Sequence, residues 1–171
     1  LYSYGETPIP KYLKRNVQKS DESNYQTLFA KIIGAVAAPA AGLHFSRETF
    51  KWCEIKNIEL AEVTLHIGLG SFRPIEVEDL SKHKMDSEHF IVSREASETV
   101  NKAIAGRKHI CAVGNTVLRT LESAVSTDNK LKPIEGWTEK FIYPPYTFSI
   151  ADRLITNFHA PMSAFYISTS A

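Results

Sequence analysis

The stretch that decides the fold runs from Ser93 to Val125 and reads SREASETVNKAIAGRKHICAVGNTVLRTLESAV. Its first part predicts a helix, because apolar residues recur on one helical face at Ala96, Val100, Ala103 and Ile104. Ser93 is placed to cap this helix, and Gly106 stands just past its end. The compact apolar run from His109 to Val113 then predicts a strand.

A second helix is predicted directly after this strand. Gly114 turns the chain and Asn115 is a good capping residue. The buried face of the helix is predicted at Val117, Leu121, Ala124 and Val125. Arg119 and Glu122 stand three positions apart on the remaining face, where they form either part of a site or an exposed ion pair worth roughly a few tenths of a kcal/mol.

The flanking sequence continues the alternation of helices and strands. A helix is predicted from Ser46 to about Asn57, and strands are predicted at Ile58 to Ile67, at Ser87 to Val92, and around Phe141, Phe148 and Leu154–Ile155. The expected fold class is therefore α/β, a layered α/β domain with a mixed sheet that is parallel at least in part. Residues 1–30 are polar and punctuated by prolines, which is typical of a linker or docking segment.

The composition is that of a globular protein, with 43% hydrophobic and 23% charged residues. A net charge of +1 argues against nucleic-acid binding over the whole surface, so any RNA contact must rest on a local basic patch. Two separated cysteines without a CxxC pair fit a reducing compartment, and the apolar neighbours of Cys111 predict that it is buried. The longest apolar stretch, Ile32 to Leu43, is too short and too interrupted for a bilayer span of about 20 residues. A cytosolic location is expected.

Three loops follow predicted strands, and in a parallel sheet they would meet at its carboxyl edge. The first carries His66, Gly68, Gly70 and Arg73. The second begins a helix with Asn115 and Thr116, and the third carries Asn157 and His159. Each also has a purely structural interpretation: a turn with a surface arginine, a structural histidine, or a helix cap.

The segment His83–His89 contains two histidines and two carboxylates, side chains that bind metals in other proteins. The spacing matches no compact zinc pattern, and neighbouring lysines would repel a cation, so no metal is expected. The sequence has no GxSxG, HExxH or P-loop motif, and readings as a serine hydrolase, a zinc protease or an NTPase therefore lack support. The residues alone predict an α/β domain with a polar site at strand ends.

Eight blocks of the sequence are more specific. In chain order they are GETPIPKY from Gly5, YQTLFAK from Tyr25, AAPAAGLHF from Ala37, TLHIGLGSFRP from Thr64, HKMDSEHF from His83, AVGNTVLRTLES from Ala112, GWTEKFIYPPYTF from Gly136 and LITNFHAPMS from Leu154. In order and spacing they resemble the C-terminal half of the S-adenosylmethionine:tRNA ribosyltransferase-isomerases of queuosine biosynthesis. The resemblance covers essentially all of the chain.

The resemblance implies a discontinuous α/β domain with a β-barrel inserted in it. Residues 1–30 would return from the missing barrel, and residues 31–171 would form an α/β domain truncated at its C-terminus. It implies a cytoplasmic enzyme, expected to be a monomer. The enzyme would transfer and isomerise the ribosyl group of S-adenosylmethionine onto 7-aminomethyl-7-deazaguanine at the wobble position of tRNA. Epoxyqueuosine-tRNA, adenine and methionine would be the products, and S-adenosylmethionine would serve as a substrate.

The resemblance also suggests roles for individual residues. The acid/base candidates are His44, His66, Glu122 and His159. The substrate-binding candidates are Phe45, Gly68, Gly70, Arg73, Asn115, Thr116, Arg119, Tyr143 and Asn157. The two arginines suit the methionine carboxylate, the polar side chains suit the nucleoside, and the aromatic rings suit a base or the sulfonium cation.

The chain departs from the family pattern at several positions. Ala40 and Asn115 stand where threonine is usual, Pro145 stands where glycine is usual, and Ala160–Ala164 replaces a pattern closer to LPKST. These departures keep an alternative open, namely a diverged homologue or fragment that binds RNA or a nucleoside without catalysis.

Overall fold

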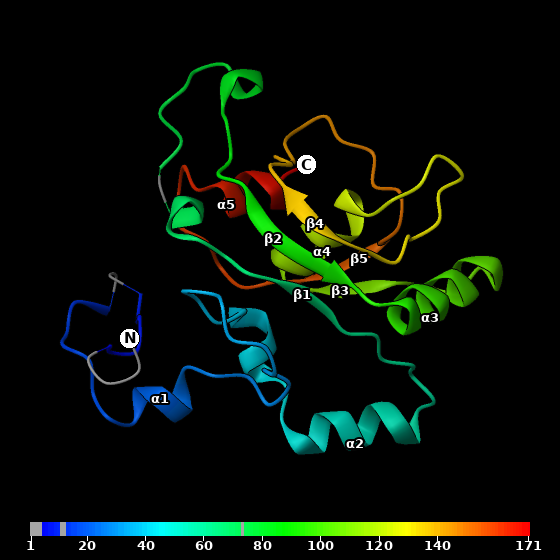
Figure 1. Ribbon diagram of the computed structural model, residues 1–171, viewed down its shortest axis with the longest axis horizontal. Helices are drawn as coiled ribbons and strands as arrows, with labels where there is room; N and C mark the ends of the chain where they lie inside the picture. Colours follow the sequence, from blue (N-terminus) through cyan, green and yellow to red (C-terminus); the bar gives the residue numbers. More distant parts are fainter. Residues whose placement is uncertain (1–4, 11–12, 73) are drawn as a thin grey trace.

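The computed structural model describes residues 5–10, 13–72 and 74–171 (Figure 1). The strands form two small sheets. The first is antiparallel, in the order β1 (Val63–Leu65), β2 (Glu88–Val92) and β4 (Ile134–Thr138). The second pairs β3 (Cys111–Val113) with β5 (Arg153–Ile155) in parallel. The fold is therefore α/β with both kinds of strand pairing, as the sequence predicts.

Five α-helices and several 3-10 turns accompany these strands in the described part of the chain. The helices are α1 (Asp21–Asn24), α2 (Arg47–Ile55), α3 (Arg94–Ala105), α4 (Asn115–Ser123) and α5 (Ala164–Thr169). The 3-10 helices are Ala40–His44, Leu69–Phe72 and Leu80–Lys82. Figure 1 shows α4 behind the antiparallel sheet, whereas the segment that leads to α2 lies to one side of both sheets.

The helix α3 is confirmed nearly as predicted. The Ser93 side chain accepts a hydrogen bond from the backbone N–H of Ala96, and Val100 faces the core. The end of the helix differs in detail, because Gly106 keeps a negative φ and Arg107 adopts the left-handed conformation with φ of 51°. The helix α2 is likewise capped by Ser46, as predicted.

The strand predicted from Ile58 to Ile67 is reduced to β1. Its first residue, Val63, pairs with Val92, the last residue of β2. Ser93 already caps α3, so the residues before Val63 have no strand to pair with. Ile58 and Leu60 are accordingly exposed.

The later strands are only partly as predicted. The strand around Leu154–Ile155 is confirmed as β5, but residues around Phe141 and Phe148 are not in a strand. The strand of that region is β4, which lies earlier in the chain and was not predicted. Its apolar pattern is weak, because Gly136 occupies its centre and Trp137 is exposed.

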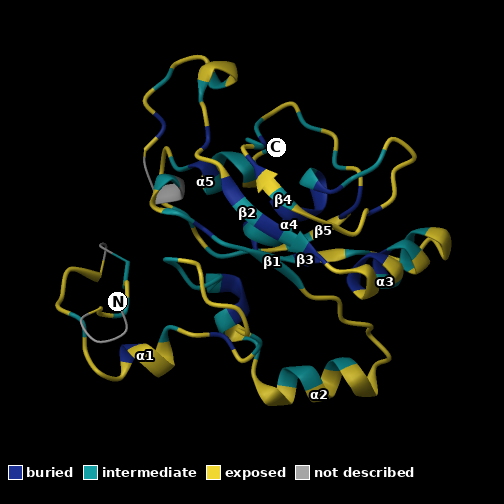
Figure 2. Cartoon of the chain, in the orientation of Figure 1, coloured by how far each residue is buried: buried dark blue, intermediate teal, exposed yellow. Residues whose placement is uncertain are grey.

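The core lies between α4 and the two sheets, where Figure 2 shows the buried residues gathered. Phe90 and Val92 of β2 pack there with Leu118 and Leu121 of α4. Burying a side chain of this size stabilises the fold by about 1.5–3 kcal/mol. The helix α4 is buried almost all round, which fixes the orientation of its polar side chains as well.

The prediction that Cys111 is buried is wrong. Cys111 is exposed, whereas its neighbour Ala112 is buried in the core. Successive side chains of a strand point to opposite faces, so only one of the two can face the core. The apolar composition of this run did not indicate which one.

The segment before α2 contacts the residues that follow β1. The backbone N–H of Val36 donates to the carbonyl of Ile67 at 3.0 Å. Gly34 lies so close to His66 that an added Cβ would stand 2.5 Å from the ring nitrogen Nδ1. Closer to the N-terminus, Arg15 and Asp21 form a bidentate ion pair.

None of the helices in the described residues is long and apolar enough to span a bilayer.

Candidate functional site

The parallel pair of β3 and β5 brings two of the predicted loops to one edge. Both strands run in the same direction, so the loops after Val113 and after Ile155 begin side by side. The backbone N–H of Gly114 donates to the carbonyl of Ile155 at 2.8 Å. Gly114 has φ of 102°, a conformation that favours glycine, and this turn delivers Asn115 to the edge.

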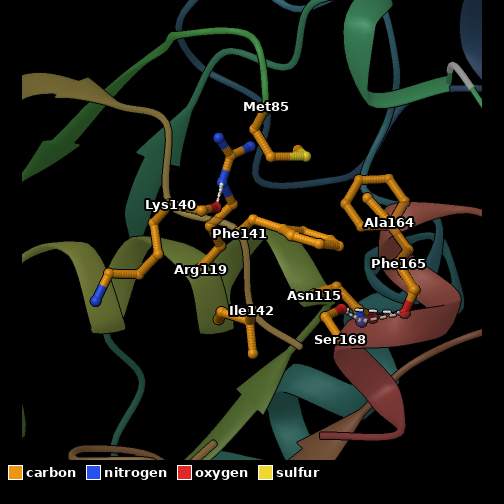
Figure 3. Close-up of a pocket in the computed structure, with 9 residues that line it drawn as sticks. All are labelled: Met85, Asn115, Arg119, Lys140, Phe141, Ile142, Ala164, Phe165 and Ser168. Carbon is orange, nitrogen blue, oxygen red and sulfur yellow. Dashed lines mark hydrogen bonds between the residues drawn. The ribbon is translucent and has the colours of Figure 1, made fainter. Parts of the chain in front are cut away.

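Asn115 is the centre of this edge and only 6% exposed. It is the first residue of α4, but its side chain does not cap the helix, so the capping interpretation is wrong. The amide Nδ2 instead donates to the carbonyl of Phe165 at 3.1 Å and to Ser168 Oγ at 2.8 Å (Figure 3). It also donates to Thr169 Oγ1 at 2.9 Å. This side chain therefore fixes α5 against the start of α4.

His159 completes the edge from the third loop. Its Nε2 lies 2.9 Å from Thr156 Oγ1 and 3.2 Å from Asn115 Oδ1. Its ring packs at a tilt on Phe165, with the centroids 5.5 Å apart. Burial lowers the pKa of His159 below its ordinary value, so the imidazole is neutral near pH 7.

A second histidine borders the same loop. His44 ends the 3-10 helix Ala40–His44, and its Nε2 lies 3.5 Å from Asn157 Nδ2. His44 is exposed and Asn157 is half-buried. The segment that most resembles the family signature is thereby adjacent to the loop that carries His159.

The glycine loop after β1 reaches this region from the other sheet. The N–H of Gly68 donates to Glu88 Oε1 at 2.8 Å, and a Cβ added at Gly70 would fall 1.9 Å from Asp86 Oδ2. Farther along, the N–H of Ile75 donates to the carbonyl of Met162 in the third loop at 2.8 Å. Arg73, the predicted carboxylate partner of this loop, lies outside the described residues.

Arg119 is buried, with 5% of its surface exposed. Its guanidinium pairs with Glu88 and donates to the carbonyls of Lys140 at 2.8 Å and Thr138 at 3.0 Å. Burial lowers the pKa of Arg119, and the charge of Glu88 opposes this shift. The guanidinium thus ties α4 to β2 and to the end of β4.

Glu122 is buried separately on α4, with only 1% exposure. Its carboxylate accepts hydrogen bonds from the N–H groups of Ser149 and Ile150, at 3.0 and 3.2 Å, and from the hydroxyl of Tyr146 at 3.1 Å. Burial and the charge of Glu122 raise the pKa of Tyr146. The interpretation of Arg119 and Glu122 as an exposed ion pair is therefore wrong, because each is buried with other partners.

The remaining candidates make their contacts elsewhere. His66 stacks on His89 with ring centroids 5.6 Å apart, Phe45 packs against Phe50, and Tyr143 stacks on Phe141. Thr116 is half-buried beside Asn115. The structure thus brings together Asn115 and His159, with His44 and Asn157 adjacent to them.

A small cavity lies behind Asn115, between α4, α5 and the chain after β4 (Figure 3). Its lining comprises Met85, Asn115, Arg119, Lys140, Phe141, Ile142, Ala164, Phe165 and Ser168. Its volume of about 20 Å³ holds a single water molecule. A nucleoside cannot enter it.

Sequence reasoning missed Thr156 and the structural role of Glu88. Glu88 alternates with Phe90 and Val92 on the buried side of β2, and a charge on that side requires a partner. Within the segment His83–His89, His83 packs on Phe141 and His89 contacts Glu135. Among the described residues there is no group of three or more potential metal ligands.

The chain matches the family described as "Queuosine biosynthesis protein" along residues 1–171. Over its whole length it is 53% identical to the S-adenosylmethionine:tRNA ribosyltransferase-isomerase of Cytophaga hutchinsonii and 56% identical to that of Flavobacterium psychrophilum. The protein of that name from Clostridioides difficile is 46% identical. The chain spans about half the length of these curated relatives, between 49% and 50%.

A solved structure supports the same relationship. The S-adenosylmethionine tRNA ribosyltransferase of Thermotoga maritima is similar to this fold with a TM-score of 0.61 and 32% identity. The similarity covers 77% of this chain and 40% of that one. The resemblance stated from the eight sequence blocks is thereby confirmed, and the chain belongs to the queuosine biosynthesis protein family.

Proposed function

We propose that this chain provides part of the active site of an S-adenosylmethionine:tRNA ribosyltransferase-isomerase. The single observation that carries the proposal is the group formed by Asn115, Thr156 and His159 where the two parallel strands end, with His44 and Asn157 beside it. The family membership of the chain supports the same reaction. The enzyme would use S-adenosylmethionine as ribosyl donor and tRNA with 7-aminomethyl-7-deazaguanine at the wobble position as acceptor.

The chemistry of this group suits the proposed reaction. Ribosyl transfer and isomerisation require a group that accepts and returns protons, and a neutral imidazole does this near neutral pH. The amide of Asn157 and the backbone of the glycine loop offer hydrogen bonds to a nucleoside. Epoxyqueuosine-tRNA, adenine and methionine would be the products, and no step requires a metal. We place the enzyme in the cytoplasm as a monomer.

The candidates for binding the methionine carboxylate differ in their surroundings. The guanidinium of Arg119 already contacts Glu88 and two backbone carbonyls. Using it for a substrate would take the arginine countercharge away from the buried carboxylate of Glu88, which is costly. We therefore assign the carboxylate to Arg73. Glu122 is similarly engaged, so His44, His66 and His159 are the stronger acid/base candidates.

Substrate binding tests the proposal. Because the chain spans half of its relatives, it is best studied in a chimera, in which it replaces the matching half of the Flavobacterium psychrophilum relative. S-adenosylmethionine binding is measured by calorimetry. Replacing Asn157 by alanine should weaken binding about tenfold, equivalent to about 1.4 kcal/mol. The control variant Asn16→Ala, at an exposed position, should bind like the unchanged chimera.

The outcomes are distinct. Binding that weakens with Asn157→Ala and not with Asn16→Ala supports the proposal. A folded chimera that binds S-adenosylmethionine equally with either substitution contradicts the placement of the nucleoside at this edge. A chimera that binds tRNA and nucleoside but releases no adenine would favour the alternative, a homologue that binds without catalysis.

A further inference from the structure

The orientation of the Asn115 amide is fixed by its neighbours. One end of the amide faces the carbonyl oxygen of Phe165 at 3.1 Å, and a carbonyl can only accept a hydrogen bond. That end must therefore be the NH₂ group. The other end, the oxygen Oδ1, faces Thr156 and His159.

This orientation determines which protons the neighbours carry. Oδ1 of Asn115 has no proton, so the hydroxyl of Thr156 is the donor in the hydrogen bond between them. The oxygen of Thr156 then presents only lone pairs to His159. Nε2 of His159 faces these two acceptors at 2.9 and 3.2 Å, and it must carry a proton to bond with either.

The geometry points to a specific form of the imidazole. We propose that Asn115 and Thr156 are positioning residues that hold His159 as the Nε2–H tautomer and leave Nδ1 as the proton acceptor for a bound nucleoside substrate. The tautomer follows from the hydrogen bonds alone, whereas the catalytic step rests on the function proposed above. In that step an N–H or O–H bond of the substrate breaks and a bond from Nδ1 to hydrogen forms. The electron pair stays on the substrate atom, and the positive charge appears on the imidazolium.

The charges around His159 do not disturb this assignment. The helix α5, which packs against the ring, has no charged residue. On α4, Arg119 pairs with Glu88, and Glu122 binds the Tyr146–Ile150 segment. His44 contacts this loop through Asn157. The imidazolium formed in the step would be stabilised by the oxygens of Asn115 and Thr156.

Nitrogen NMR of the chain labelled with ¹⁵N-histidine tests the tautomer directly, because protonated and unprotonated ring nitrogens resonate far apart. The His159 signals are assigned by their loss in His159→Gln. We expect a protonated Nε2 and an unprotonated Nδ1 at neutral pH. Thr156→Val should reduce the share of this tautomer, whereas Thr156→Ser, which keeps the hydroxyl, should restore it. A protonated Nδ1 in the unchanged chain, or equal spectra for the valine and serine variants, would overturn the inference.

Substitutions of His159 itself test the catalytic role. Glutamine places an N–H near the position of Nε2 and has no counterpart of Nδ1, so His159→Gln should keep the hydrogen bonds to Thr156 and Asn115. It should lower kcat for adenine release by the chimera at least about 100-fold, because a general base usually raises the rate by at least this factor. It should also remove the acidic limb of the pH profile. The control variant His109→Gln, at an exposed ion pair with Asp152, should leave kcat near that of the unchanged chimera.

Failure of this inference is distinguishable from failure of the proposed function. An inactive chimera, beside an active parent enzyme, would count against the function, and the NMR result would still report on the tautomer. An active chimera whose rate and pH profile survive His159→Gln would overturn the catalytic role of Nδ1 while leaving the function in place.

Discussion

Glu88 joins two distant parts of the chain through one buried carboxylate. It accepts the N–H of Gly68 and pairs with Arg119, and it is 2% exposed. Glu88→Gln would leave the guanidinium buried without a countercharge, so the free energy of unfolding should fall by about 3–5 kcal/mol. The control Glu62→Gln breaks an exposed pair with Lys31 and should cost about 0–1 kcal/mol. Urea unfolding of both variants measures the difference, and equal losses would contradict this account of Glu88.

The two glycines of the first loop differ in the space around them. A Cβ at Gly70 would lie 1.9 Å from Asp86 Oδ2 and 2.8 Å from its Cβ, so the whole aspartate would have to move. A Cβ at Gly68 would meet nothing nearer than 3.9 Å. Gly70→Ala should therefore destabilise the chain by about 1–3 kcal/mol, the usual cost of overpacking, whereas Gly68→Ala should cost less. Thermal unfolding distinguishes them, and a greater loss at Gly68 would refute the steric explanation.

His159 should make stability depend on pH. Its pKa is lowered in the folded chain by burial, so between that value and about 6.5 the unfolded chain binds the proton more readily. The free energy of unfolding should thus fall as the pH drops below about 6.5, and it should be regained above that pH. His159→Gln should show a smaller fall over the same range in urea titrations between neutral and mildly acidic pH. Parallel curves for the two proteins would count against a buried neutral imidazole.

The sequence predicted the positions of the candidate site residues better than their contacts. Asn115 was correctly placed at a strand end, but short-range rules favour a cap, and only the approach of α5 and of the loop after β5 reveals its five hydrogen bonds. Arg119 and Glu122 are spaced as a surface pair would be. Their burial depends on the distant Glu88 and on the Tyr146–Ile150 segment, which no local pattern indicates.

At the scale of elements, Glu122 anchors a segment that has no regular structure of its own. Residues 146–150 lie in no helix or strand, yet two of their N–H groups donate to the Glu122 carboxylate. Glu122→Gln keeps one acceptor oxygen only, so it should lower the free energy of unfolding by about 1–3 kcal/mol. Hydrogen exchange at Ser149 and Ile150 should also be faster. The control Glu98→Gln removes an exposed ion pair on α3 and should leave these amides unchanged. Unchanged exchange in Glu122→Gln would rule out the anchoring role.

The elements that the sequence predicted well carry their own boundary signals. Helices α2 and α3 begin at serine caps, and β2 alternates buried and half-buried residues. Elements whose extent depends on a partner were predicted poorly. The strand β1 begins opposite the last residue of β2, and β4 exists because it pairs with β2 rather than because of its own composition. The convergence of two loops followed correctly from the parallel pairing of β3 and β5.

For the whole molecule, the part before β1 leaves much apolar surface uncovered. The helix α2 has no buried residue, and large apolar side chains are exposed at Leu28, Ile32, Ile33, Trp52, Ile55, Ile58 and Leu60. Since the relatives are about twice as long as the chain, its activity is best measured in the chimera.

We propose that this chain provides catalytic groups to a ribosyltransferase-isomerase. The most direct measurement is the release of adenine from S-adenosylmethionine by the chimera, with and without tRNA that carries 7-aminomethyl-7-deazaguanine. We expect release that requires this tRNA, proceeds in step with formation of epoxyqueuosine, and falls sharply in His159→Gln. A folded chimera that binds both substrates but releases no adenine, beside an active parent enzyme, would contradict it.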